Sequence, residues 1–130
     1  MEQDRIRLTG SEWSVLECLW EKSPHTVMQL VVQMAEKTGW AKSTTITMLR
    51  RMEEKGLVHC TISERAKHYI PAVDQKQAEI AETRSFLNRV YQGSVGLMMS
   101  AMAERQELSQ KEIAELYAIL KKAEEGQHFD

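Results

Sequence analysis

The sequence predicts a mainly α-helical chain, with three short helices and a β-hairpin in residues 1–73 and further helices in residues 74–130. Three observations support this prediction. Six glycines and two prolines among 130 residues are few, which disfavours a loop-rich sandwich or barrel. Three capping boxes mark the starts of helices. One pair of β-rich runs flanks a polar loop, which is typical of a hairpin.

The first two helices follow from their capping boxes and apolar spacing. The first opens with Thr9, three residues before Glu12. The second opens with Thr26, three residues before Gln29, and ends before Gly39. The apolar residues that follow at helical spacing are Trp13, Leu16 and Trp20 in the first helix and Val27, Leu30, Val31 and Met34 in the second.

A third helix and a hairpin complete the N-terminal half. The helix is expected over about residues 42–55, with Gly56 as its C-terminal stop. The β-rich runs at 57–62 and 68–73 are joined by a polar loop, and Pro71 confines the second run to a sheet edge or to its own end. The core-facing stripe of the helix comprises Thr45, Met48, Leu49 and Met52.

The composition changes after residue 73. Residues 74–91 lack glycine and proline and carry apolar residues at roughly helical steps, until Gly93 breaks the run. A methionine-rich segment, 95–102, is apolar on more than one face. Ser109 and Glu112 then form the third capping box and start a last helix.

These C-terminal helices predict a dimer. Three amphipathic helices of this length do not form a core alone, so segment 95–102 would be exposed in a monomer. Exposed apolar patches mark interfaces, and a symmetric dimer buries them. The alternative is that these side chains pack on the N-terminal half of their own chain. The candidate dimerisation residues are Phe86, Leu87, Val90, Val95, Met98, Met99, Met102, Ile113, Leu116 and Leu120.

The net charge of -2 averages two unlike halves. Residues 1–73 carry ten basic and nine acidic side chains, whereas residues 74–130 carry seven and ten. Within residues 37–67, seven basic residues oppose three acidic ones. A basic segment in an acidic chain is a weak footprint of nucleic-acid binding, and charge alone favours an ordinary solvated face equally well.

Three short helices followed by a hairpin form the chain order of a winged helix-turn-helix. In that fold two helices support a third, which enters the DNA major groove. Small hydroxyl side chains on the third helix allow a close approach to DNA, and an arginine fork matches a guanine or a phosphate. The candidate DNA-binding residues are Lys42, Ser43, Thr44, Thr47, Arg50 and Arg51 on the helix and Arg65 and Lys67 on the wing.

Five stretches, spread over nearly the whole chain, resemble the BlaI/MecI/CopY family of repressors, which control penicillinase, methicillin-resistance and copper-transport genes. The resemblance implies a winged-helix DNA-binding domain at 1–73, a helical dimerisation region at 74–130, and a homodimer on a double-stranded operator of inverted repeats. The stretches are LTGSEWSVLECLW (8–20), GWAKSTTITMLRRMEEKGLV (39–58), KHYIPAV (67–73), FLNRVYQGSVGLM (86–98) and LSQKEIAELYAIL (108–120). By position, the resemblance assigns DNA contacts to Ser43, Thr44, Thr47 and Arg51 on the recognition helix and to Arg65 and Lys67 on the wing.

Two positions depart from the family pattern. Ala41 and Lys42 stand where relatives usually carry serine and then proline. Losing that N-cap costs about 1 kcal/mol of helix stability unless Ser43 caps a shifted start. Ile46 stands where relatives tend to carry a polar residue, so the base preference at that step is expected to differ.

Other chemistry finds little support in the sequence. No glycine-rich phosphate loop, GxSxG or HExxH occurs, so we predict no enzyme. Cys18 has apolar neighbours and is expected to be a buried, inert thiol. His59 and Cys60 are strand neighbours that point to opposite faces, so we predict no metal and no other cofactor. The copper branch carries CxC pairs near its C-terminus, and residues 121–130 contain no cysteine.

The partners and the location follow from the same residues. No apolar run approaches 18 residues and the first ten lack a signal-peptide core, so we expect a cytoplasmic protein without a membrane partner. In β-lactam-responsive relatives a protease cuts an Asn–Phe bond in the penultimate helix. That bond corresponds here to Ala101-Met102, so release by an inducing protease and release by a ligand stay open. The rival function is a winged-helix protein–protein interaction module without sequence-specific DNA binding.

Overall fold

The computed structural model describes residues 7–126 of the chain. Residues 1–6 and 127–130, which bear on the signal-peptide and copper-motif expectations, lie outside the described residues. The structure is mainly helical with one small antiparallel sheet, which confirms the predicted fold class. The chain divides into two compact units after Ser85. No helix among the described residues is long and apolar enough to cross a membrane.

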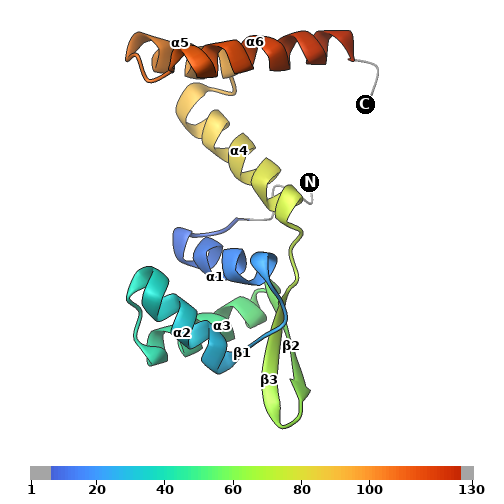
Figure 1. The fold of residues 1–130 in the computed structure, drawn as a ribbon. Coiled ribbons are helices and arrows are strands. Elements are labelled where there is room, and N and C mark those ends of the chain that lie inside the picture. The colour runs from blue at the N-terminus through green and yellow to red at the C-terminus, as the bar shows by residue number, and fades with distance from the viewer. Residues whose placement is uncertain (1–6, 127–130) are drawn as a thin grey trace. The chain divides into compact units, whose positions relative to one another are not determined.

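The first unit contains the three predicted helices, α1 (Gly10–Glu21), α2 (Val27–Thr38) and α3 (Lys42–Glu54) (Figure 1). The capping boxes predicted for α1 and α2 are both present, because each threonine side chain accepts from the backbone N–H three residues on. Gly39 closes α2 in the left-handed conformation, with a φ of 78°, which glycine adopts without steric cost. Local sequence signals therefore set the limits of these helices.

The core of this unit lies where the three helices meet the sheet. Burial of apolar surface is the main favourable term in folding, and these side chains are almost fully removed from water. Cys18 is part of this core, and burial raises the pKa of its thiol, which confirms the predicted buried position. The core side chains are Val15, Leu16 and Leu19 of α1, Leu30 and Met34 of α2, Leu49 and Met52 of α3, and Val58 and Tyr69 of the sheet.

The hairpin wing consists of β2 (Val58–Ser63) and β3 (Ala66–Pro71). Both strands extend closer to the turn than the sequence predicted, so that only Glu64 and Arg65 lie between them. Two-residue turns with positive φ match the twist of paired strands, and these residues have φ values of 52° and 67°.

A short third strand was not predicted. It is β1 (His25–Thr26), which pairs with β3, so the strand order is β1-β3-β2 and β3 is central. Pro71 is therefore at the end of its strand and not at a sheet edge, which decides between the two predicted placements.

The first unit also holds the start of α4 (Gln75–Tyr91). Trp20 Nε1 donates a hydrogen bond of 2.9 Å to the carbonyl of Val73 and so fixes the chain between the wing and α4. Ala78 and Ala81 of α4 are buried. The predicted boundary at residues 73 and 74 coincides with the approach to α4, and the functional division into two domains stays a prediction.

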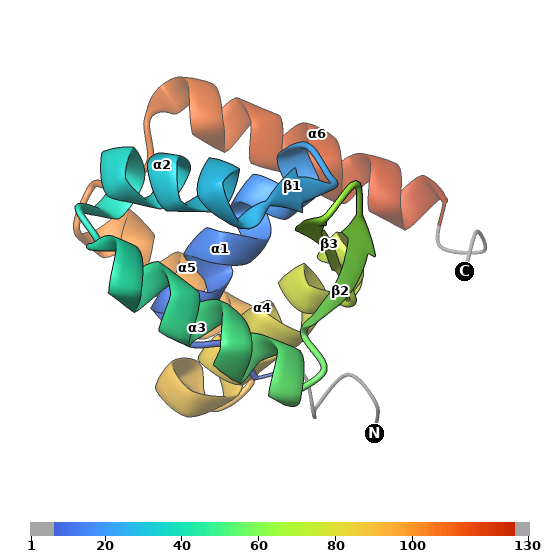
Figure 2. The ribbon, with the colours of Figure 1, turned by 90° about the horizontal axis from the view of Figure 1, so that it is seen from below.

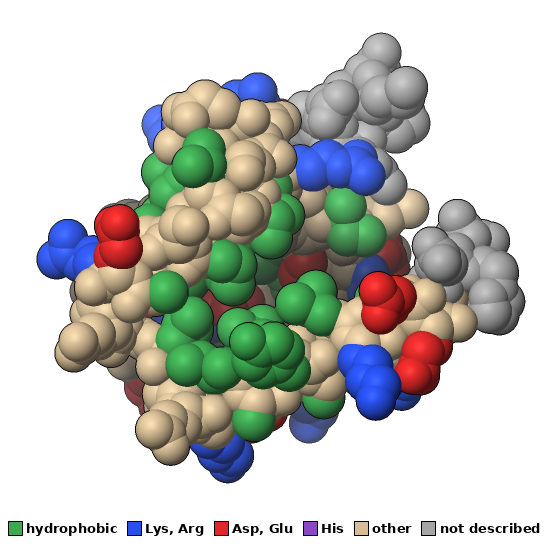
Figure 3. Space-filling view, turned by 90° about the horizontal axis from the view of Figure 1, so that it is seen from above, with side chains coloured by type: hydrophobic (Ala, Val, Ile, Leu, Met, Phe, Trp, Pro, Cys, Tyr) green, Lys and Arg blue, Asp and Glu red, His purple; other side chains and the backbone are tan. Residues whose placement is uncertain are grey.

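The second unit comprises the end of α4, α5 (Val95–Glu104) and α6 (Gln110–Glu125). The predicted capping box of Ser109 and Glu112 is present, and the Ser109 backbone N–H holds the pKa of the Glu112 carboxyl below its usual value. No residue of α5 or α6 is fully buried. Hydrophobic side chains gather over these C-terminal helices on the face shown in Figure 3.

Candidate nucleic-acid interface

The outer face of α3 carries the predicted reading residues. Ser43, Thr44, Thr47 and Arg51 are all exposed and line one surface depression of about 220 Å³, together with Met48. Spacings of three and four residues place side chains on one face of a helix, so this arrangement follows from the sequence. Figure 2 shows the ribbon from below, with α3 next to the two strands of the hairpin.

The orientation of α3 is set by its opposite face. Thr45, Leu49 and Met52 are buried, as the predicted stripe requires. Met48 is half-buried: it packs against the core, as predicted, and it also lines the depression with the reading residues. Its position at the edge of the stripe explains both contacts.

The start of α3 has no side-chain cap. Ala41 is the N-cap residue and makes no capping hydrogen bond, so the helix begins at Lys42 and not at a shifted position capped by Ser43. The side-chain cap that a serine would supply at this position is therefore absent from α3. Lys42 and Ser43 are exposed in the first turn, where their side chains are available to a ligand.

A groove of about 240 Å³ separates α3 from the wing. Its apolar part consists of Val27, Ile46 and Leu49. Ile46 is half-buried in this groove and not in the depression that holds the reading residues. The expectation of an altered base preference at Ile46 stays a prediction.

The polar part of the groove comes from both elements. Arg50 and Glu53 are one turn apart on α3, and Lys67 and Tyr69 are two residues apart on β3 and thus on the same face of the sheet. Burial raises the pKa of Tyr69 to about 12, with further contributions from the neighbouring Cys60 and Glu53 side chains. The Tyr69 hydroxyl therefore stays protonated at neutral pH. Glu53 of α3 and Tyr69 of the wing, which the sequence did not single out, line the groove together.

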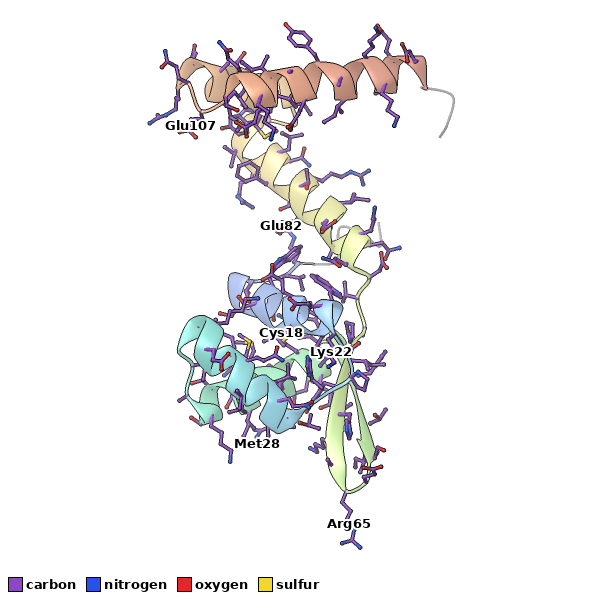
Figure 4. The ribbon with its side chains drawn as sticks, viewed as in Figure 1. Cys18, Lys22, Met28, Arg65, Glu82 and Glu107 are labelled. Carbon is purple, nitrogen blue, oxygen red and sulfur yellow. The ribbon has the colours of Figure 1, made fainter. Side chains whose placement is uncertain are left out.

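Arg65 occupies the tip of the wing. Its side chain points away from the three helices, as Figure 4 shows. The φ of 67° at Arg65 is a left-handed conformation that glycine adopts more readily. An arginine at this turn position therefore carries a backbone strain that a glycine would avoid.

The cations of this face differ in their partners from those elsewhere in the unit. Lys37 pairs with Glu17 at 2.8 Å, and Lys55 pairs with Glu12. At the candidate DNA-binding residues, by contrast, no described carboxylate forms a salt bridge with a basic side chain. The basic side chains there are Lys42, Arg50, Arg51, Arg65 and Lys67.

The candidate dimerisation residues lie in the second unit on α4, α5 and α6. Phe86, Val90, Val95, Ile113 and Leu120 are exposed, and the remaining five are half-buried. Three further exposed large hydrophobic residues of the second unit were not among the candidates: Leu97, Tyr117 and Ile119. Tyr117 belongs to the same helical stripe as Ile113 and Leu120, so the spacing already pointed to it.

Within residues 7–126, no group of three metal-ligating side chains converges. On the wing, His59 lies opposite Ile70, and Cys60 lies opposite Tyr69. The two side chains thus belong to opposite faces of the sheet.

The chain is similar to penicillinase repressors and to a methicillin resistance regulatory protein. A profile of the penicillinase repressor family matches residues 8–122. The penicillinase repressor of Bacillus licheniformis is 30% identical over 114 residues, which cover 88% of this chain and 89% of that protein. The methicillin resistance regulatory protein MecI of Mammaliicoccus sciuri is 25% identical over 122 residues, or 94% of this chain and 99% of that protein.

Solved structures support the fold. The match to the DNA-binding domain of the repressor BlaI covers 55% of this chain and 87% of that domain, with a TM-score of 0.50 and 22% identity. The monomeric form of Bacillus licheniformis BlaI in complex with the blaP half-operator matches with the same coverage, score and identity. The profile match extends over the winged helix and the C-terminal helices alike, and the chain therefore belongs to the penicillinase repressor family.

Proposed function

We propose that this protein is a transcriptional repressor that binds a double-stranded operator of inverted repeats as a homodimer and has no enzymatic activity. The observation that carries the proposal is the outer face of α3, where Ser43, Thr44, Thr47 and Arg51 line one depression. The buried stripe of the same helix directs this face outward, away from the core. Family membership supports the same function.

The chemistry of this face suits a DNA major groove. An arginine fork binds the O6 and N7 atoms of guanine or a phosphate, and threonine hydroxyls bond bases or phosphates. The Met48 side chain adds an apolar contact of the kind that suits a thymine methyl group. The depression thus offers hydrogen-bonding and apolar groups to base edges, while Arg65 at the wing tip offers a charge to the backbone.

The dimer is proposed from the C-terminal helices. Leu120 has 64% of its surface exposed and Tyr117 has 73%, and both lie on α6. A second copy of the chain would bury these side chains and bring two reading helices to one inverted repeat. The proposed repressor acts in the cytoplasm, and either a protease or a ligand releases it from DNA. Ala101 and Met102, at the position of the cleaved bond in relatives, lie within α5.

Salt dependence of duplex binding tests the DNA-binding part. Phosphate contacts release counterions, so the affinity for DNA should fall steeply as the salt concentration rises. Arg51→Ala should cost about 1–3 kcal/mol of operator affinity with an unchanged melting temperature. Arg105→Ala, at an exposed position after α5, is the matched control and should bind like the wild type. If Arg51→Ala spares DNA binding and disrupts a protein complex, the interaction-module function replaces the proposal.

Sedimentation tests the dimer. The wild type should sediment as a dimer at micromolar concentration, and the double change of Leu116→Glu and Leu120→Glu should give a folded monomer with weaker operator binding, because one half-site loses its reading helix. The control lowers the net charge by the same two units at polar positions of α6, through Gln110→Glu and Lys121→Gln. A wild-type monomer with an intact fold would contradict the proposal.

A further inference from the structure

Two adjacent arginines of α3 belong to different surface sites. Arg51 lines the depression with Ser43 and Thr47, whereas Arg50 lines the groove between α3 and the wing. Successive residues of an α-helix point about 100° apart, so neighbours are turned toward different surroundings. Arg51 therefore lies among hydroxyl side chains, whereas Arg50 shares its groove with a second cation.

The second cation of the groove is Lys67. It comes from β3, and the alternation of strand residues places it on the same face as Tyr69, which packs into the core. Arg50 and Lys67 are both exposed, and neither forms a salt bridge with a described carboxylate. Two like charges that line one groove repel each other, and an anion bound between them relieves that repulsion.

Glu53 is the acidic side chain of the groove. It forms no salt bridge with Arg50 or Lys67, so neither cation is neutralised by a direct ion pair with it. Two cations against one carboxylate leave the groove with a net positive charge. The groove spans α3 and β3, the two elements that carry Arg50 and Lys67.

We propose that Arg50 and Lys67 together hold one phosphate of the DNA backbone in the groove between α3 and the wing, while Arg51 contacts base edges. This inference rests on the proposed DNA-binding function and divides it between two sites. The groove is open to solvent, borders the recognition helix and has apolar walls that weaken competition from water. A phosphate contact positions a protein on the duplex and carries no sequence information of its own.

The division predicts different effects on specific and non-specific DNA. Arg50→Ala and Lys67→Ala should each lower the affinities for an operator duplex and for an unrelated duplex by the same factor, and should make the salt slope shallower by about one. Because the two side chains share one phosphate, the double variant should also change the slope by about one and not by two. Arg51→Ala should lower operator affinity by about 5- to 150-fold and leave the unrelated duplex within about two-fold.

Charge-conserving variants provide the matched control. A lysine serves as a point charge for a phosphate but does not reproduce the two-pronged contact of arginine with guanine. Arg50→Lys should therefore keep both affinities and the salt slope, whereas Arg51→Lys should lose operator preference. Thermal unfolding of each variant verifies that the fold is intact.

Fluorescence anisotropy titrations of both duplexes over a range of salt concentrations test whether Arg50 and Lys67 share one phosphate. The inference is overturned if Arg50→Ala weakens only operator binding, or if the double variant changes the slope by two, because separate contacts would then be present. In both cases the wild type still prefers its operator and the proposed function stands. A wild type without preference for any duplex would overturn the proposed function itself.

Discussion

Glu12 and Lys55 connect the start of α1 to the end of α3. One carboxylate oxygen of Glu12 accepts from Lys55 Nζ, and the other accepts from the Thr9 backbone N–H at 2.9 Å, as the α1 capping box requires. The Glu12 side chain is buried, and the Lys55 side chain is half-exposed. A single residue thus caps one helix and fixes the end of the proposed recognition helix.

Glu12→Gln should lower the free energy of unfolding by about 1–2 kcal/mol, because the amide keeps the capping contact but loses the charge-assisted bond to Lys55. Urea denaturation measures the change. Glu17→Gln breaks the exposed pair with Lys37 and, as the control, should cost less than about 1 kcal/mol. Equal losses in the two variants would show that Glu12 has no special structural role.

Thr45→Val should stabilise the protein by about 1 kcal/mol. The Thr45 hydroxyl oxygen is buried on the core side of α3 and has no hydrogen-bond partner among the described residues. Valine has the same shape without the polar atom, and both residues are β-branched, so helix propensity changes little. Thr47→Val on the exposed face is the matched control and should leave the melting temperature nearly unchanged. A less stable Thr45→Val would mean that the hydroxyl has a partner.

Ala41→Ser should raise the free energy of unfolding by about 1 kcal/mol, because serine at the N-cap accepts a hydrogen bond from a free backbone N–H of the first turn. Thermal or urea denaturation detects the gain. Ala41→Val, which adds bulk without an acceptor, serves as the control. No difference between the two variants would place the start of α3 elsewhere.

Stability should fall as the pH rises from 10 to 12, and Tyr69 should contribute to that fall. The folded-state pKa of Tyr69 is raised to about 12, above the ordinary value of 10, so the folded state keeps its proton while the unfolded state loses it. The contribution is fully present below pH 10 and is lost as the pH passes through 12. Denaturant midpoints for the wild type and Tyr69→Phe should converge over this interval. Parallel pH profiles would contradict the raised pKa.

Much of the fold could be predicted because its signals are local. Capping boxes lie within four residues of one another, and the buried stripe of α3 fixes the direction of Thr47 and Arg51. Local patterns therefore also gave the reading face of the candidate site.

The missed features depend on contacts between distant residues. The strand β1 has only two residues and exists through its pairing with β3, more than 40 residues away. The groove that Glu53 and Tyr69 line likewise lies between two elements whose approach depends on the packing of the whole unit. The second contact of Met48, with the depression, was also missed, because helical spacing alone does not show how far the core extends around α3.

Selection of bound sequences from a random pool of duplexes tests the central claim most directly. A homodimer that reads DNA with α3 should enrich an inverted repeat whose half-sites are centred about one helical turn, or a whole number of turns, apart. In the same selection Arg51→Ala should lose the enrichment. Enrichment of single, unrepeated sites, or no enrichment by the folded wild type, would contradict the account.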